Sequence, residues 1–255
     1  MKNIVTSLLM AVLLALVPTA QAWAAETFTL VLDAGHGGRD PGALGKKGKE
    51  KNINLAVTLA VGKLVEQNIK DVKVVYTRKT DVFIELDERA AIANRAKADL
   101  FVSIHTNALP RGAQGKGSET YTLGMHRAAD NLAVAKRENS AIMLERDYEN
   151  RYEGFDPKSA ESYIIFEFMQ DKNMEQSVKL ATMIQRQFRS AGRPDKGVHQ
   201  AGFLVLRATS MPSCLVELGY ITTAAEENYL LSERGVNELA NSIYQAIKKY
   251  KESIQ

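Results

Sequence analysis

The sequence predicts an α/β fold: a single-domain sandwich with a mostly parallel (mixed) sheet covered by helices on both faces. Short apolar runs typical of strands alternate along the chain with longer segments of helical periodicity. One run, Leu100–Ile104, is almost wholly apolar, as expected of a strand buried on both faces. No internal repeat or Pro/Ser-rich linker interrupts this alternation. One domain is therefore the simplest prediction.

The individual elements follow from local composition. Runs of β-branched and aromatic residues, ended by Gly- and Pro-rich breaks, predict strands at residues 28–32, 72–77, 100–104, 119–123, 202–206 and 213–218. Apolar residues at helical spacing predict helices at residues 50–64, 86–98, 174–188, 226–231 and 236–250. In such sheets the ligand crevice lies beyond the carboxyl ends of the strands. The residues that follow each strand are therefore the first candidates for a site.

The N-terminus, residues 1–25, has the layout of a secretory signal peptide. Lys2 is followed by an uncharged apolar run over residues 4–17, and small residues at 20, 22 and 24 have cleavage-type spacing. The run is shorter than the roughly 20 residues that span a bilayer, which favours cleavage over a membrane anchor. We therefore expect export to the periplasm, or to the cell-wall space of a cell without an outer membrane. The mature domain would be residues 26–255.

Composition narrows the class of protein further. The 255 residues are 45% hydrophobic and 25% charged, with a formal net charge of +3, which gives no reason to expect a nucleic-acid partner. The single cysteine, Cys214, lies in an apolar run and excludes an intrachain disulfide. We expect a buried, inert thiol and a monomeric protein that depends on its core.

Four ionisable residues stand where predicted strands end or a predicted helix begins. His36 follows the first strand, His105 follows the strand at 100–104, and Glu217 lies at the end of the strand at 213–218. Glu50 opens the first helix. Two imidazoles and two carboxylates could therefore converge at one edge of the sheet.

This set of residue types matches a catalytic zinc site. Two imidazoles and a carboxylate, here His36, His105 and Glu50, are a known ligand set that keeps one position open for water. Zinc lowers the pKa of that water to about 7, and Glu217 would take its proton as general base. Each residue also has a plainer interpretation. Either histidine could be structural, Glu50 could favour the helix dipole, and Glu217 could be an ordinary strand-end carboxylate.

The same residues lie in four blocks that resemble the zinc N-acetylmuramoyl-L-alanine amidases of the amidase-3 type, which are bacterial cell-wall hydrolases. The blocks are LDAGHGGRDPG at 32–42, EKNINL at 50–55, VSIHTNA at 102–108 and LVELGYI at 215–221, in family order. The resemblance covers roughly residues 27–250. It implies that His36, Glu50 and His105 bind one Zn²⁺ ion and that Glu217 is catalytic. Asn107 could contact substrate or form a turn.

The resemblance also implies a substrate and a partner. The reaction would be hydrolysis of the amide between N-acetylmuramic acid and L-alanine of the stem peptide, during wall turnover or daughter-cell separation. Peptidoglycan is then the macromolecular partner. Division amidases of this kind can carry an inhibitory helix near residues 141–161, which covers the zinc until an activator protein of the division machinery removes it. In this chain that segment is short and aromatic, and we hypothesise a cleft-lining loop; a solvated surface loop is the alternative.

Two other functions fit parts of the sequence. A metal-free wall-binding protein would keep the fold without catalysis, although all four key positions hold competent residues. A zinc peptidase that cuts within stem peptides would share the ligand set and differ in its substrate pocket. The residues alone do not show whether the substrate pocket is that of an amidase or that of a peptidase.

Overall fold

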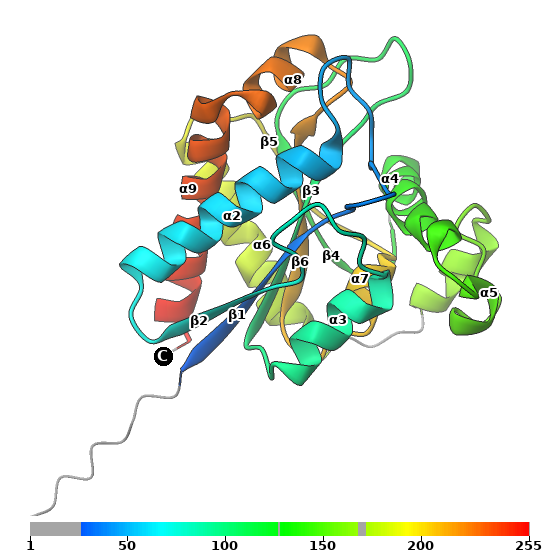
Figure 1. The fold of residues 1–255 in the computed structure, drawn as a ribbon, viewed down its shortest axis with the longest axis horizontal. Helices are drawn as coiled ribbons and strands as arrows, with labels where there is room; N and C mark the ends of the chain where they lie inside the picture. Colours follow the sequence, from blue (N-terminus) through cyan, green and yellow to red (C-terminus); the bar gives the residue numbers. More distant parts are fainter. Residues whose placement is uncertain (1–26, 127, 168–171, 255) are drawn as a thin grey trace, which may run out of the picture.

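The computed structural model describes residues 27–126, 128–167 and 172–254, and the predicted signal peptide lies outside them. These residues form an α/β sandwich around a six-stranded mixed sheet with strand order β2-β1-β3-β6-β4-β5 (Figure 1). The predicted fold class is confirmed. Within the described residues, no helix is long and apolar enough to cross a membrane.

The sheet divides into two parallel blocks. Strands β2, β1, β3 and β6 are parallel to one another, whereas β4 and β5 are parallel to each other and join β6 through an antiparallel pairing. The strands are β1 (Phe28–Ala34), β2 (Val72–Tyr76), β3 (Leu100–Asn107), β4 (Ser118–Leu123), β5 (Asp195–Ala201) and β6 (Ser213–Tyr220). The carboxyl ends of β1, β3 and β6 therefore lie at the same edge of the sheet.

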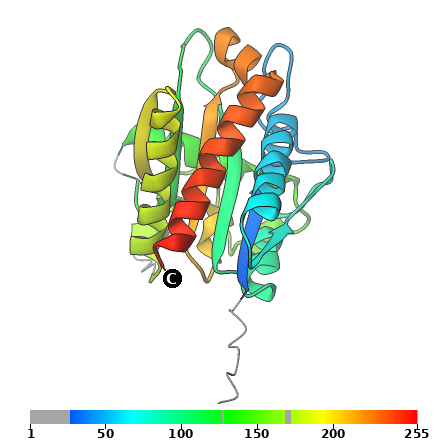
Figure 2. The same cartoon turned by 90° about the vertical axis from the view of Figure 1, so that its left-hand side faces the viewer.

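Helices cover both faces. Helices α2, α6 and α9 form one layer, with α9 packed between the other two (Figure 2). The opposite face is covered mainly by α3, α4 and α7, together with the segments that follow α4. The helices are α2 (Glu50–Asn68), α3 (Leu86–Arg95), α4 (Ala129–Asn139), α5 (Tyr148–Arg151), α6 (Met174–Ser190), α7 (Leu204–Arg207), α8 (Ala224–Leu231) and α9 (Glu233–Glu252), with 3₁₀ turns η1 (Ser140–Leu144) and η2 (Glu161–Glu167).

Each face of the sheet buries its own apolar core, because side chains alternate along a strand. In β1, Leu30 and Leu32 pack beneath α2 and α9, whereas Val31 packs on the other face. Cys214 is buried in the first of these cores, and burial raises the pKa of its thiol. This is the inert position expected for it.

One predicted strand is wrong. Residues 202–206 do not extend the sheet; Leu204–Arg207 form the short helix α7, and the strand lies just before them, at Asp195–Ala201. The apolar run resembles a strand because Leu204, Val205 and Leu206 are all apolar. Here a helical turn buries them in the core on the α3 and α4 face of the sheet, the second core. The polar sequence of β5 conceals a strand because it lies at the edge of the sheet, where its residues are only partly buried.

A buried ion pair fixes the end of β1. Asp33 is fully buried and accepts hydrogen bonds from Arg89 Nη1 at 2.8 Å, Thr77 Oγ1 at 2.6 Å and Ser103 Oγ at 2.6 Å. Arg89 also donates to the backbone oxygens of Ala34 and His36. The pair therefore holds the backbone on both sides of Gly35, where the first candidate ligand begins.

Replacing Asp33 with Ala is expected to destabilise the protein by about 3–5 kcal/mol, because it leaves the buried guanidinium of Arg89 unpaired. Burial alone would raise the Asp33 pKa, but Arg89, Ser103 and Thr77 outweigh it and hold the pKa below its ordinary value. The stabilisation is thus present above the unfolded-state pKa and is lost as pH falls. Thermal unfolding measures it, with the exposed Asp130→Ala as control; a change as small as the control's would contradict this account.

Candidate metal centre and active site

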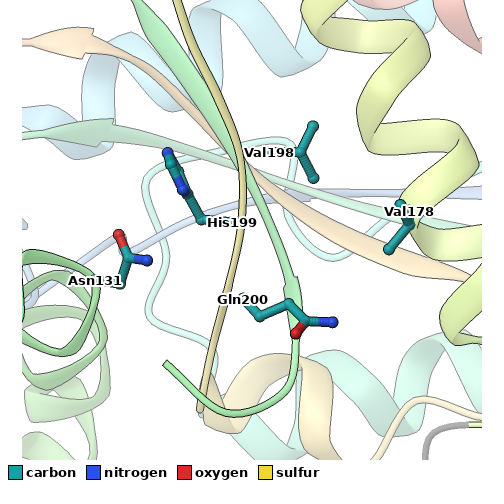
Figure 3. A pocket seen from close by; sticks show the side chains of 5 residues that line it. All are labelled: Asn131, Val178, Val198, His199 and Gln200. Carbon is teal, nitrogen blue, oxygen red and sulfur yellow. The ribbon is translucent and has the colours of Figure 1, made fainter. Parts of the chain in front are cut away.

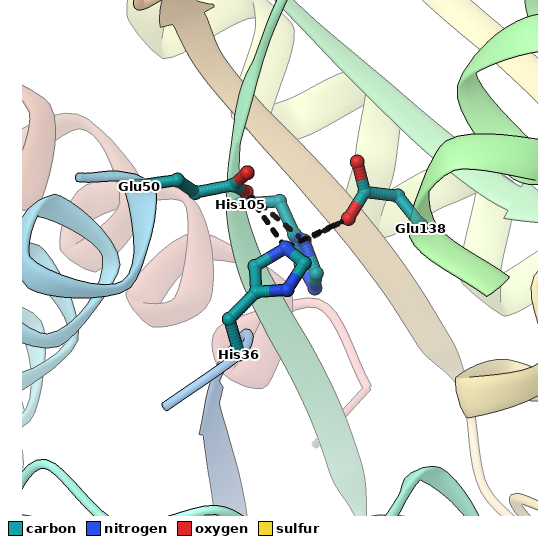
Figure 4. Close-up of side chains that lie close together, drawn as sticks. All are labelled: His36, Glu50, His105 and Glu138. Atoms are coloured by element: carbon teal, nitrogen blue, oxygen red, sulfur yellow. Dashed lines mark hydrogen bonds and ion pairs between the residues drawn. The ribbon is translucent and has the colours of Figure 1, made fainter. Parts of the chain in front are cut away.

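Four side chains from distant parts of the sequence meet at the carboxyl edge of the sheet (Figure 4). His36 follows β1, Glu50 opens α2, His105 lies in β3, and Glu138 comes from α4. One donor atom from each lies within 4.8 Å of the others, and all four residues are buried. The three ligands expected from the sequence are therefore brought together, and a fourth side chain joins them.

The loop that carries His36 depends on glycine. His36 has a positive φ of 61°, and Gly42 has a φ of 64°. A Cβ on Gly35 would lie 2.3 Å from Nε2 of His105, and one on Gly42 would lie 2.7 Å from both Glu50 and His36. Larger residues at either position would collide with the cluster, which explains the glycines on both sides of His36.

Glu50 begins a helix, but the helix dipole does not account for its environment. Its carboxylate is fully buried and accepts hydrogen bonds from the backbone N–H of Thr106 at 2.8 Å and of Ala43 at 2.7 Å. Oε1 lies 3.2 Å from His36 Nε2 and 3.3 Å from His105 Nδ1. A buried carboxylate aimed at two imidazole nitrogens is the arrangement expected of a metal ligand.

Glu138 was not identified from the sequence. Its Oε2 lies 2.9 Å from His36 Nε2 and 2.8 Å from His105 Nδ1, so it occupies the fourth corner of the cluster. A glutamate in a charged segment resembles a solvated helix face, and no motif marks it. The signal that could have found it was the polar pair Arg137–Glu138 beside apolar Val134 and Ala135, which indicates that this side of the helix is buried.

The four donors lie slightly closer together than a tetrahedral ion would hold them. Donors 2.0–2.2 Å from such an ion would be about 3.3–3.6 Å apart, whereas the four nitrogen–oxygen separations here are 2.8–3.3 Å, so a small outward shift would accommodate an ion. Nδ1 of His105 is among the buried side-chain atoms in the described residues that have no hydrogen bond, although Glu138 is close by. This nitrogen therefore lies close to both carboxylates without hydrogen-bond geometry to either, as it would if all three approached one cation.

His36 is also held from its other nitrogen. Nδ1 lies 2.8 Å from Asp40 Oδ2, which leaves Nε2 directed at the cluster. A carboxylate on the far nitrogen of an imidazole fixes its tautomer and raises its basicity. Without a cation, burial would lower the pKa of His105, but Glu138 and Glu50 outweigh it and raise the pKa to about 9. Positive charge is therefore favoured at this point, whether a proton or a metal ion supplies it.

Glu217 lies beside the cluster and does not belong to it. It is paired in register with His105 across β3 and β6, and it is fully buried. Its Oε1 lies 3.3 Å from Arg137 Nη2, whereas Oε2 is buried without a hydrogen-bond partner in the described residues. Burial, assisted by Glu138, raises the pKa of Glu217 well above its ordinary value. A carboxylate of raised pKa next to a metal centre suits a general base.

Comparison with known proteins identifies the family. The family model described as N-acetylmuramoyl-L-alanine amidase matches residues 30–249, nearly the whole described chain. The chain belongs to the N-acetylmuramoyl-L-alanine amidase family.

Individual relatives agree with this assignment. AmiC of Escherichia coli is 34% identical over 228 residues; the match covers 87% of this chain and 52% of AmiC, so this chain spans about half the length of that relative. An amidase structure from Clostridium difficile superposes with a TM-score of 0.67 at 29% identity, covering 91% of this chain and all of that one. The CwlD amidase of Clostridioides difficile, solved with the GerS lipoprotein, has a TM-score of 0.64 at 26% identity and covers 89% of this chain and 99% of CwlD.

In this amidase-family chain, α4 reaches both halves of the site. Glu138 meets the imidazoles, and its neighbour Arg137 lies against Glu217. The Arg137 guanidinium also donates to Ala108 O at 3.0 Å and pairs with Glu138 Oε1 at 2.8 Å. One helix therefore places a carboxylate in the candidate metal cluster and a cation beside Glu217, the candidate general base.

The aromatic residues on which the cleft-loop hypothesis for segment 141–161 depended pack into the core, although Leu144 O accepts hydrogen bonds from Arg39 in the His36 loop. Tyr152 and Phe155 are buried in the second core. Glu145 accepts a hydrogen bond from the backbone N–H of Leu86 at 2.8 Å, and Arg151 pairs with Glu145 at 3.2 Å. These contacts anchor the segment to the start of α3. The residues that approach the site, Arg137 and Glu138, come just before it.

A cavity of about 490 Å³ extends from the site toward β5. Asn107, the candidate substrate residue, lines it and donates from Nδ2 to Glu119 Oε1 at 2.5 Å. Its Oδ1 accepts from the backbone N–H of Ala108, so the turn role and a place at the cavity coexist. A second hollow of about 330 Å³ adjoins the cavity at the sheet edge and shares His199 and Asn131 with it (Figure 3).

Proposed function

We propose that this protein is a zinc-dependent N-acetylmuramoyl-L-alanine amidase, which hydrolyses the amide between the muramic-acid lactyl group and L-alanine of the stem peptide. Family membership and the buried cluster of His36, Glu50 and His105 beside Glu217 support the proposal. Two imidazoles and one carboxylate favour zinc over magnesium or calcium, which prefer oxygen ligands alone.

The chemistry divides between the ion and the chain. Bound zinc would polarise the scissile carbonyl and acidify a water molecule. His36, Glu50 and His105 would hold the ion, with Asp40 fixing the orientation of His36. Glu217 would remove the proton from the attacking water and return it to the nitrogen, so that the C–N bond breaks to give a carboxylic acid and an amine. No covalent intermediate with the protein is required.

The arrangement of α4 supports regulation of this site. Glu138 occupies the corner where the water would bind, and Arg137 neutralises the general base. We infer that the form described here is closed and that α4 must move before substrate can bind. An activator protein is the expected means, and peptidoglycan is the expected substrate. Export to the periplasm or the wall space would follow from the signal peptide predicted at residues 1–25.

Replacing Glu138 with Ala should raise basal activity about tenfold or more, because it frees the fourth metal position while keeping the three other ligands. A tenfold rise in activity corresponds to a closed form that is more stable than the open form by roughly 1.4 kcal/mol. Hydrolysis of purified sacculi without activator measures it. The matched control is Glu149→Gln, which removes a similar charge from an exposed site on α5. Activity in Glu138→Ala equal to or below that of the control would contradict the closure.

Mass spectrometry of digested sacculi tests the reaction itself. The proposal predicts free stem peptides that begin at L-alanine, together with glycan strands that have lost their peptides. Shortened peptides still attached to glycan would show a zinc peptidase instead. Undigested sacculi that retain bound protein, with no stoichiometric metal, would show a wall-binding protein. Glu217→Gln is the control for contaminating hydrolases.

A further inference from the structure

Three ionisable residues lie in a row across the sheet. His105 of β3 is in register with Glu217 of β6, which in turn is directly opposite Glu119 of β4. Paired residues on neighbouring strands point to the same face, with strands about 4.8 Å apart. Glu119 is therefore the next carboxylate beyond the general base, on the side away from the metal ligands.

This row orients the substrate. The scissile carbonyl must face the metal ligands, and the leaving nitrogen must face Glu217, which returns the proton to it. The group attached to that nitrogen then extends away from His105, over Glu119. This inference rests on the proposed function, because it assumes that Glu217 acts as general base on an amide.

The space needed for such a group lies over Glu119. The 490 Å³ cavity is lined by Glu119 and Tyr121 of β4, by Asn107 and Tyr220, and by Lys196 and His199 of β5. Arg137 also lines it and contacts Glu217, so this side chain separates the cavity from the metal centre in the closed form. Helix α4 itself supplies one wall of the cavity, including Asn131, Val134 and Arg137. When α4 moves, that wall opens, and the floor formed by β3, β4, β5 and β6 becomes continuous with the centre.

Neighbouring side chains fix the position of the Glu119 carboxylate. Its Oε1 accepts hydrogen bonds from Asn107 Nδ2 at 2.5 Å and from the Tyr220 hydroxyl at 3.0 Å. Its Oε2 lies 3.7 Å from His199 Nε2, too far for a hydrogen bond. Glu119 is only 7% exposed, yet it lines the cavity, and a carboxylate can accept about four hydrogen bonds. It therefore retains the capacity to accept another from a ligand.

We propose that the strand-built floor of this cavity, which remains when α4 moves, binds the peptide side of the substrate and that Glu119 is a positioning residue for the leaving nitrogen. Its carboxylate accepts the single N–H of the amide, which directs the lone pair that forms on nitrogen toward Glu217. After cleavage, nitrogen holds that hydrogen and the proton from Glu217, and a third proton from solvent gives an ammonium that Glu119 binds. The floor continues past His199 to the free edge of β5, where a longer peptide can leave (Figure 3).

Binding of the peptide product tests this without turnover. The probes are the tripeptide L-Ala-γ-D-Glu-L-Lys with a free amine and the same peptide N-acetylated, titrated calorimetrically into the zinc-loaded mature chain carrying Glu138→Ala. The free amine is expected to bind about tenfold more tightly, as one charge-assisted hydrogen bond provides. Adding Glu119→Gln should remove this preference, and Glu119→Asp should restore part of it.

Glu227→Gln is the matched control. Glu227 is a buried glutamate whose carboxylate accepts from the backbone of Lys47 and Gly48, so its loss removes the same charge elsewhere and should leave the preference unchanged. A preference that survives Glu119→Gln in a folded protein would overturn the proposal. If the Glu119 variants do not fold, the NMR resonances of Asn107 and Tyr220 in the Glu138→Ala protein are followed as the free-amine peptide is added. Resonances that do not shift would also contradict the proposal. Sacculi left undigested by the wild type would instead contradict the proposed function, whatever the peptide binding shows.

Discussion

Replacing Glu217 with Gln is expected to reduce amide hydrolysis by about 10²–10⁴-fold, the usual contribution of a general acid–base group. The amide side chain keeps the shape of the carboxylate but cannot accept the proton of the attacking water. Zinc should remain bound, because His36, Glu50 and His105 are untouched. Release of stem peptides from sacculi and the zinc content of the same sample are the two measurements.

The pairing of these two results makes the test specific. Lost activity with full zinc occupancy assigns Glu217 to proton transfer, and Glu227→Gln can serve as a control that removes a buried carboxylate outside the site. Activity retained by Glu217→Gln would contradict the assignment. Loss of zinc together with activity would instead make Glu217 part of the metal centre.

Replacing Glu50 with Ala should lower zinc affinity at least about a hundredfold, the upper range for losing a residue that only orients a ligand. Activity should fall with zinc occupancy and return in part with excess zinc. The change also leaves the backbone N–H groups of Thr106 and Ala43 without their acceptor, so thermal stability should fall as well. Glu50→Gln, which keeps one acceptor oxygen, should fold better and still bind zinc poorly.

Full zinc occupancy in both Glu50 variants would contradict its role as a ligand. It would leave the alternative that the sequence allowed, an acidic residue that only favours the start of α2. Burial argues against this alternative, since a carboxylate that only compensates a helix dipole needs no removal from solvent, whereas Glu50 is fully buried.

Much of the site was predictable because it is built from strand ends. His36, His105 and Glu217 follow or end apolar strands, and parallel strands place such residues at one edge of the sheet. Glu50 could be assigned only through the family resemblance, because its helix-start position has its own explanation. The sheet class followed from the alternation of elements, although the polar edge strand β5 was missed.

Glu138 could not be predicted, for a physical reason. It reaches the centre through the packing of α4 against the carboxyl edge, a tertiary arrangement that leaves no local pattern in the sequence. The aromatic segment after it was a more visible candidate, but aromatic side chains are as well suited to a core as to a cleft, and Tyr152 and Phe155 belong to the core. Glu119 was concealed in a strand of ordinary composition until register aligned it with Glu217.

Zinc-edge X-ray absorption of the purified mature protein, with metal content measured on the same sample, tests the central claim most directly. The account predicts one zinc ion per chain with only nitrogen and oxygen ligands at about 2.0–2.2 Å, including two imidazoles. His105→Ala should lose the ion. Absence of stoichiometric zinc, an unaltered spectrum in His105→Ala, or a sulfur ligand, which only Cys214 or a methionine could provide, would contradict it.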